Sequence, residues 1–317
     1  MYKHITLHNK FARQSTALFN ETQMPSNINA LTQINLDDLV ASFGLQNQSL
    51  LAQALRSLFR KPARAFAHQM AEFDKAIGVH GLVGASRLAL GHYVHDISVF
   101  GADQLPASAF LALSNHPGMS DTLSLFAALY RPDLRIIAFQ RPFLESLPNL
   151  SNQLYYINDD MASRMTLIRQ VSTHLRNGGA ALTFPAGRIE PDPDIHNGAV
   201  ESLQSWTDSV GVFIRMAPET AIVPVLVRGV VWEKAAYHWL TKIKKTERER
   251  EKLAAALQLL AYTALRVKPV SARVQIGRPI YAKDLGTTKT QAIHGAVLNE
   301  MTRLIENPPE GKGERIL

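Results

Sequence analysis

The sequence predicts an α/β protein with a mixed, largely parallel central sheet, flanked by helices and preceded by an N-terminal helical segment. Short apolar runs alternate with amphipathic helical patterns from Asp96 onward, and this alternation is typical of strands joined by crossover helices. Hydrophobic residues make up 46% of the 317 residues and charged residues 19%, so the chain can bury a sizeable core.

Three regions follow from the local patterns. Residues 1–35 are rich in Asn, Gln, Thr and Ser and predict a loosely attached arm. Residues 36–93 predict a helical segment, in which Gly78, Gly81 and Gly84 mark turns before a last helix. Residues 94–310 predict the α/β domain.

The strands of this domain are predicted from short apolar runs bounded by turn residues. They begin with Ile97 and Val99 and continue with 109–113, 134–139, 154–157, 180–184, 222–227 and 273–276. The intervening helices are predicted from apolar residues at helical spacing. One follows Ser120, with Leu123, Phe126, Ala127 and Tyr130 on one side; others span 232–267 in at least two pieces and 288–305.

The best-defined helix follows Asp159 and Asp160. Its apolar stripe is Met161, Met165, Ile168, Val171 and Leu175, and Gly178 can cap its end.

Composition restricts the chemistry. The sequence contains no cysteine, which excludes disulfides, thiolate metal sites and a cysteine nucleophile, and makes the cytoplasm the expected location. No apolar run is long enough to span a membrane, and no signal peptide is visible at the start. The formal net charge of +7 indicates an anionic partner: a phosphate-bearing substrate, an acidic lipid surface or a nucleic acid.

Two segments carry the candidate chemistry. The first, Asn115-His116-Pro117-Gly118-Met119-Ser120-Asp121, leads from an apolar strand into a helix for which Ser120 is the predicted N-cap. Asp121 falls in the first helical turn, close enough to accept the Nδ1–H of His116, which would leave Nε2 as a general base. The alternative is that Asp121 only caps the helix and His116 is an ordinary loop residue.

The second segment, Phe184-Pro185-Ala186-Gly187-Arg188, repeats this logic at another strand end. Pro185 ends the strand, Gly187 allows close approach of backbone, and Arg188 supplies a cation suited to phosphate. Such loops gather at the carboxyl edge of a parallel sheet, where ligands bind.

The two segments, in this order and followed by Val223-Pro224-Val225, resemble the signatures of the glycerophosphate and lysophospholipid acyltransferase superfamily. The similarity covers roughly residues 94–280. Asn115, His116 and Asp121 complete the first block, and Arg141-Pro142-Phe143 lies where a basic middle block is expected. The third block departs from the family, because Ala186 replaces a glutamate and Arg188 stands one position early, with Ile189 at the usual arginine position.

The resemblance implies transfer of a fatty acyl group from an acyl-CoA or acyl carrier protein thioester to the hydroxyl of a glycerophosphate or lysophospholipid, with no other cofactor. His116 and Asp121 are the implied catalytic pair. Backbone N–H groups near Gly118 or Gly187 would bind the oxyanion. The implied substrate-binding residues are Asn115, Gly118, Arg141, Phe184, Pro185, Gly187, Arg188 and Pro224.

Other readings of the sequence stay open. The altered third block also permits an N- or O-acyltransferase acting on an amino-acid or sugar acceptor, and a non-catalytic lipid-binding protein could keep the same fold. A serine hydrolase is disfavoured because Ser120 lacks the second glycine of a nucleophile elbow. His92, His95 and Asp96 are expected to be solvated or core residues, and no metal site is predicted. The acidic loop Glu190, Asp192, Asp194 and His196 is expected to be solvated, and the alternative is that it shapes the mouth of the acceptor site, because it directly follows Arg188.

Arg56, Arg60, Lys61 and Arg64 have no acidic residue between them and are flanked by Phe59 and Phe66. A solvated face is slightly favoured for this helix, and contact with a membrane is the other interpretation. The pattern suits an interfacial helix on an anionic lipid surface, on the inner face of a membrane. No nucleic-acid recognition motif is present, so specific nucleic-acid binding is not expected.

Overall fold

The computed structural model describes residues 27–45, 49–158, 160–243, 246–264, 267–268 and 270–317. The strands are β1 (Val94–Phe100), β2 (Phe110–Ser114), β3 (Arg135–Phe139), β4 (Leu154–Ile157), β5 (Ala180–Thr183), β6 (Ala221–Arg228), β7 (Val270–Ile276) and β8 (Glu314–Arg315). The helices are α1 (Ile28–Ser42), α2 (Leu50–Leu90), α3 (Asp121–Leu129), α4 (Pro142–Glu145), α5 (Pro148–Ser151), α6 (Met161–Arg176), α7 (Ala199–Ser202), α8 (Val210–Met216), α9 (Glu233–Ala236), α10 (Glu247–Ala264) and α11 (Thr290–Glu306).

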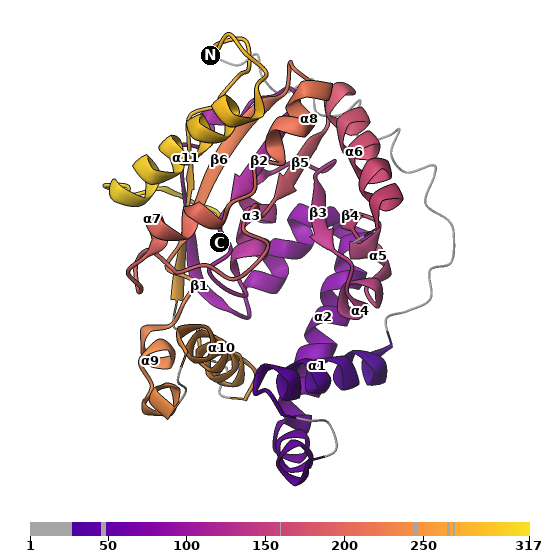
Figure 1. Ribbon diagram of the computed structural model, residues 1–317. Coiled ribbons are helices and arrows are strands. Elements are labelled where there is room, and N and C mark those ends of the chain that lie inside the picture. The colour runs from indigo at the N-terminus through magenta and orange to yellow at the C-terminus, as the bar shows by residue number, and fades with distance from the viewer. Residues whose placement is uncertain (1–26, 46–48, 159, 244–245, 265–266, 269) are drawn as a thin grey trace, which may run out of the picture.

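Within the described residues the strands form one eight-stranded sheet in the order β4-β3-β5-β2-β6-β7-β1-β8 (Figure 1). The five strands β4, β3, β5, β2 and β6 run parallel to one another. Strand β7 is antiparallel to β6, and β1 is parallel to β7. The short β8 closes the edge antiparallel to β1. The predicted mixed, largely parallel α/β fold is confirmed.

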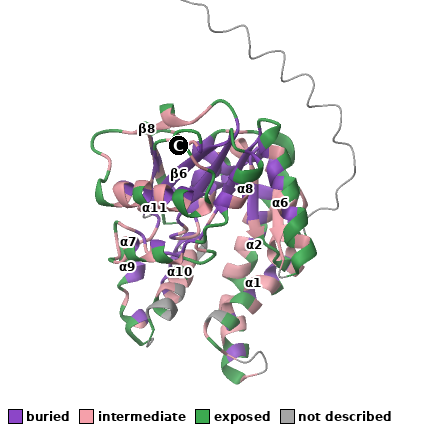
Figure 2. Cartoon of the chain, turned by 45° about the horizontal axis from the view of Figure 1, so that its top comes forward, coloured by how far each residue is buried: buried purple, intermediate pink, exposed green. Residues whose placement is uncertain are grey.

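Helices cover both faces of the sheet, and the central strands are buried between them (Figure 2). On β2, Phe110 and Ala112 belong to one apolar cluster, with side chains of α2 and α3. Leu111 and Leu113 belong to the opposite cluster, with side chains of α6, α8 and α11. This alternation explains why the strand is a continuous apolar run, since both of its faces are covered.

The N-terminal region differs from its prediction in two places. Helix α1 begins at Ile28, inside the segment expected to be a loose arm, because the side chain of Asn27 accepts the N–H groups of Asn29 and Ala30. The remainder of that predicted arm, residues 1–26, lies outside the described residues. Helix α2 continues through Gly78 and Gly84 and is interrupted only at Gly81, where φ is 70°.

Helix α6 begins where the sequence predicts, with the Asp160 side chain accepting the N–H of Ser163 at 3.0 Å. Its apolar stripe is only partly buried: Val171 and Leu175 lie in the core, whereas Met161 is 72% exposed. The first turn of α6 therefore does not contribute its apolar side chain to the core.

Helix α3 ends at Leu129, so Tyr130, predicted to lie on the apolar side of the helix, is outside it. Tyr130 has a positive φ of 48° and is exposed. Ser120 occupies the N-cap position, but its hydroxyl makes no capping hydrogen bond and is buried. The predicted capping role of the Ser120 side chain is therefore wrong, and the Asp121 side chain instead accepts the N–H of Thr122 in the first helical turn.

Candidate active site

The two candidate segments meet because their strands are neighbours. In the parallel pair β2–β5, Leu113 lies opposite Thr183, so the loops that follow leave the same edge of the sheet. Strand β6, on the other side of β2, ends at this edge as well, since Ser114 lies opposite Val225. Three carboxyl ends of parallel strands thus converge on one place, as in other open α/β sheets that bind ligands.

The His116 side chain is held by Asp121. Its Nδ1 lies 2.8 Å from Oδ2 of Asp121, an oxygen that also accepts the N–H of Gly118 at 2.8 Å. The other oxygen, Oδ1, accepts both the N–H and, at 2.9 Å, the hydroxyl of Thr122. The Asp121 side chain is fully buried, whereas 30% of the His116 side chain is exposed. A carboxylate acceptor at Nδ1 fixes the tautomer and leaves Nε2 free of this pair.

Asn115, predicted to contact substrate, lies buried between two strands. Its Nδ2 donates to the Val227 carbonyl at 2.9 Å, and its Oδ1 accepts the N–H of Val227 at 2.8 Å. These bonds extend the β2–β6 pairing beyond Ser114 and fix the start of the His116 loop. Asn115 therefore has a place in holding the sheet together, and its contact with substrate stays a prediction.

The second segment lies against the first. The Phe184 ring is 4.9 Å from the His116 ring, measured between centroids. Pro185 is buried, and Gly187 turns the chain with a φ of 61°. A Cβ on Gly187 would lie 3.2 Å from Cε2 of Phe139, so the bend also packs closely on the end of β3. Arg188 is exposed.

Two other residues of the predicted binding set occupy different surroundings. Arg141 is exposed at the start of α4, and its charge acts on His116. Pro224 lies within β6 opposite Leu113, is buried, and accepts the N–H of Gly277 through its carbonyl at 2.8 Å. The contacts of Pro224 belong to the sheet, and its role in substrate binding stays a prediction.

The acidic loop after Arg188 is not mostly solvated, so that expectation is wrong. Glu190 is 2% exposed and Asp192 is fully buried. Asp192 accepts the N–H groups of Gly229, Val230 and Val231 at 2.8 to 3.0 Å. It thereby ties this loop to the chain that leaves β6.

Glu190 reaches the His116 loop directly. Its Oε2 accepts the N–H of His116 at 3.2 Å, and its own N–H donates to the His116 carbonyl at 3.0 Å. Its Oε1 accepts Nε1–H of Trp206 at 2.7 Å and the hydroxyl of Ser202 at 3.1 Å. The sequence offered one signal for this: the acidic loop directly follows Arg188, but nothing local distinguishes a buried glutamate from a solvated one.

Further along the same loop, Asp194 forms ion pairs with Arg228 at 3.4 Å and Arg273 at 2.5 Å. Arg228 is 2% exposed, and its guanidinium also donates to the Leu304 carbonyl at 2.8 Å. These contacts offset part of the cost of burying the Arg228 charge, although its Nε has no hydrogen-bond partner among the residues that the structure describes.

The surroundings of His116 raise its pKa above the usual 6.5. Burial acts to lower the pKa, but the charge of Asp121 and its hydrogen bond outweigh this effect. The Glu190 carboxylate also raises the pKa of His116, and Arg141 opposes it. For Glu190, burial acts in the opposite direction and raises the pKa. The hydrogen bonds from Trp206, Ser202 and the His116 backbone act to lower it, but they do not outweigh burial.

The two glycines in the bends use their own N–H groups internally. The N–H of Gly118 bonds to Asp121, and that of Gly187 donates to the Phe184 carbonyl at 3.0 Å. The N–H groups of these two glycines therefore stabilise the shape of each bend, and oxyanion binding by backbone N–H groups near Gly118 or Gly187 stays a prediction.

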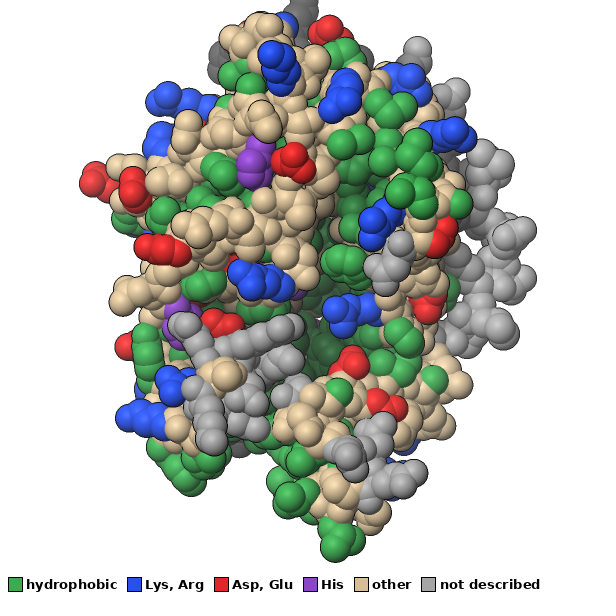
Figure 3. All heavy atoms as spheres, viewed as in Figure 1, with side chains coloured by type: hydrophobic (Ala, Val, Ile, Leu, Met, Phe, Trp, Pro, Cys, Tyr) green, Lys and Arg blue, Asp and Glu red, His purple; other side chains and the backbone are tan. Residues whose placement is uncertain are grey.

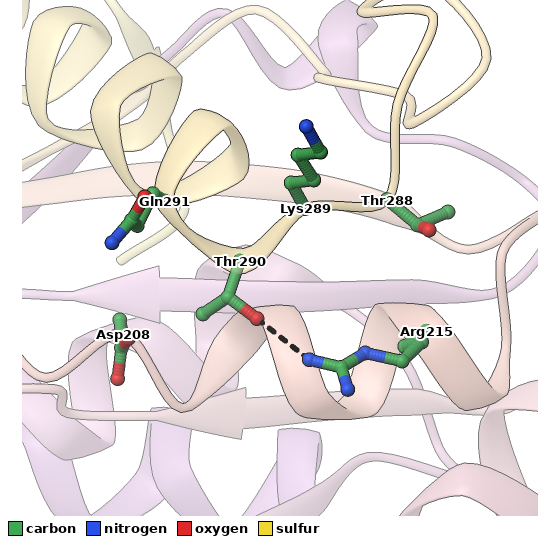
Figure 4. A pocket seen from close by; sticks show the side chains of 6 residues that line it. All are labelled: Asp208, Arg215, Thr288, Lys289, Thr290 and Gln291. Carbon is green, nitrogen blue, oxygen red and sulfur yellow. Dashed lines mark hydrogen bonds between the residues drawn. The ribbon is translucent and has the colours of Figure 1, made fainter.

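The surface is hollowed in the middle of the view in Figure 3, with hydrophobic and Lys or Arg side chains around the opening. In the same view, the carboxyl ends of the central strands point towards this hollow (Figure 1). A separate depression of about 400 Å³ lies between α8 and the start of α11 (Figure 4). Arg215 there donates to the Thr290 hydroxyl at 3.0 Å.

Comparison with known proteins gave few matches. No protein-family model matches the sequence, and no curated protein matches it. The fold is similar to the crystal structure of the 1-acyl-sn-glycerophosphate acyltransferase PlsC from Thermotoga maritima, with a TM-score of 0.43 and 18% sequence identity. The similarity covers 91% of this chain and 100% of that one. At this level it carries no inference about activity, so the assignment of function depends on the residues around His116.

Proposed function

We propose that this protein is an acyltransferase that moves a fatty acyl group from an acyl-CoA or acyl carrier protein thioester to the hydroxyl of a glycerophosphate or lysophospholipid. The observation that carries the proposal is the pair formed by His116 and Asp121, with 2.8 Å between Nδ1 and Oδ2. The imidazole is partly exposed beside the Phe184 bend, whereas its carboxylate partner is buried. A ring held in this way has the geometry of a general base.

The chemistry follows from this geometry. Nε2 of His116 removes the proton of the acceptor hydroxyl as its oxygen attacks the thioester carbonyl. The tetrahedral intermediate then collapses, the C–S bond breaks, and the imidazolium returns the proton to the departing thiolate. Asp121 stabilises the imidazolium between these steps, and proton transfer of this kind contributes about 10²- to 10⁴-fold in rate.

The acceptor class rests on the cations near the ring. Arg188 and Arg141 are exposed, on the bend beside His116 and at the start of α4. Guanidinium groups suit the phosphate of a glycerophosphate. The departures at Ala186 and Ile189 favour, as a second candidate, transfer to the amine or hydroxyl of an amino-acid or sugar acceptor.

We further propose that the protein works as a cytoplasmic, peripheral membrane protein. In the described part of the chain, no helix is long and apolar enough to cross a bilayer. Two segments far apart in the sequence project at the same end of the molecule in Figures 1 and 2, the start of α2 and the region of α9 and α10. Leu50 at the first is 83% exposed, and Trp239 near the second is 66% exposed.

Basic side chains accompany the first of these segments. Arg60 and Lys61 are exposed on α2, as an interfacial helix on anionic lipid requires. Arg56, expected to lack an acidic partner, pairs with Asp37 of α1 at 2.5 Å. That part of the expectation is wrong, because α1 packs along α2 and brings in an acid that the local sequence does not show.

The decisive experiment measures thiol release from a long-chain acyl-CoA and an acyl carrier protein thioester with glycerol 3-phosphate, lysophospholipids and amino-acid lipids as acceptors. We expect acceptor-dependent release by the wild type and none by His116→Ala. His92→Ala, at an exposed histidine, is the matched control. Equal thermal midpoints for the two variants would exclude unfolding.

Near-normal turnover by His116→Ala would refute the role of this ring. Failure of the wild type to release thiol with any acceptor, together with tight binding of acyl chains or liposomes, would favour a lipid-binding protein without catalysis.

A further inference from the structure

Glu190 is a buried carboxylate for which the proposed reaction has no direct use. It follows Arg188 by two positions and is 2% exposed. Its side chain and its backbone both bond to His116, at 3.2 and 3.0 Å. This two-way contact joins the loop that carries the imidazole to the loop that carries the exposed Arg188.

The carboxylate is itself fixed from the other side. Its second oxygen accepts hydrogen bonds from Trp206 at 2.7 Å and Ser202 at 3.1 Å. The Trp206 ring is 4% exposed and belongs to the apolar cluster of α6, α8 and α11. The backbone of His116 is thus connected through one glutamate to the packed interior on that face of the sheet.

Asp121 cannot supply this connection. Its acceptors are filled by His116, Gly118 and Thr122, which all belong to its own loop and the first turn of α3. Asp121 therefore orients the ring within the loop, whereas Glu190 fixes where the loop stands relative to the neighbouring bend. Misplacement by about 1 Å can cost about 100-fold in rate.

We propose that Glu190 is a positioning residue for the reaction at His116. It sets the distance between the imidazole and the Phe184–Arg188 bend, and its negative charge favours the imidazolium that forms during proton transfer. The charged groups that act on this ring are Asp121, Glu190 and Arg141. The inference rests on the proposed function for its kinetic consequences, but not for its geometric ones.

The test compares Glu190→Gln with Asp192→Asn. Each variant removes one buried negative charge from the same loop, but Asp192 bonds to the backbone of residues 229–231 and not to His116. We expect Glu190→Gln to lower kcat by about 10- to 100-fold and to move the acidic limb of kcat/KM to lower pH, because the imidazolium loses a stabilising charge. Asp192→Asn should lower the thermal midpoint and leave both kinetic properties unchanged.

Glu190→Asp distinguishes the effect of the negative charge from the effect of side-chain length. It keeps the negative charge but shortens the side chain by one methylene, so it cannot span from Trp206 to the His116 backbone. We expect the acidic limb to stay near that of the wild type while kcat falls. An unchanged kcat and acidic limb in Glu190→Gln, or the same changes in Asp192→Asn, would overturn the proposal.

A measurement without turnover distinguishes this inference from the proposed function. Titration of the His116 ring by NMR, assigned from the signal lost in His116→Ala, should show a lower midpoint in Glu190→Gln than in Asp192→Asn. That result would support the positioning contact even if no acyl transfer were found. Identical His116 titration in both variants would refute it, whatever the activity.

Discussion

The loop after β2 and the loop after β5 both place carboxylates at the same edge of the sheet, but they use them differently. Asp121, at the end of the first loop, bonds to residues no more than five positions away. Glu190 and Asp192, in the second loop, bond to His116 and to residues 229–231. The first loop thus contains both members of the proposed catalytic pair, whereas the second holds separate parts of the chain in place.

This difference explains why the contacts of the loop after β2 could be predicted from the sequence, whereas those of the loop after β5 could not. Local hydrogen bonds follow from spacing, because the turn at Pro117 and Gly118 leaves few conformations for the residues before Asp121. The bond between His116 and Glu190 spans 74 positions. It exists only because β2 and β5 are neighbours in the sheet.

The largest expected effect tests the self-contained character of the first loop. Asp121→Asn replaces an oxygen that accepts Nδ1–H with an amide that can also donate, so the required tautomer is no longer enforced. We expect kcat/KM to fall by about 10²- to 10⁴-fold in the thiol-release assay. In a His116→Ala background the same change should cost no further activity, because the two residues act as one unit.

Asn115→Ala tests what holds the first loop at its start. The change leaves the N–H and the carbonyl of Val227 without their buried partner. We expect the free energy of unfolding to fall by about 3 kcal/mol, measured by denaturant titration. A loss below about 1 kcal/mol would show that the β2–β6 pairing does not depend on this side chain.

The pH dependence follows from the direction of the His116 shift. The base must be neutral, and its pKa lies above the usual 6.5, so kcat/KM should fall about tenfold per pH unit below that raised pKa. The protonated ring also stabilises the fold, a contribution present at low pH and lost as the pH rises through the raised pKa. His116→Ala should therefore cost more stability at about pH 5 than at about pH 8.

The smallest effect separates the two exposed arginines. We expect Arg188→Ala and Arg141→Ala each to raise the KM of an anionic acceptor about tenfold, the value of one charge-assisted hydrogen bond. Only Arg141 acts on the His116 pKa, so only Arg141→Ala should move the acidic limb, and towards higher pH. An unchanged acceptor KM in both variants would favour an uncharged acceptor.

Much of the fold could be predicted from local pattern. Strand β4 has the predicted bounds, and α6 begins directly after Asp160, as predicted, because short apolar runs and side-chain caps act over a few residues. The direction of β7 could not be predicted. It runs antiparallel to β6, and an apolar run has the same appearance in either direction.

The candidate site divides in the same way. The proximity of His116 and Asp121 follows from five positions of sequence, and the geometry agrees with it. The partner of Arg56 and the burial of Glu190 could not be predicted, because the local sequence does not distinguish a solvated acidic residue from one that is buried or paired. Only packing of α1 on α2, and of β5 beside β2, distinguishes these cases.

The sequence by itself determined the α/β layering, the turn between β2 and α3, and the presence of an imidazole and a carboxylate within hydrogen-bonding reach. Tertiary structure alone decided that Asn115 reaches Val227 and that Glu190 reaches the His116 backbone. The reason is that hydrogen bonds within a turn are fixed by a few dihedral angles. Those between distant strands depend on how the whole sheet is ordered.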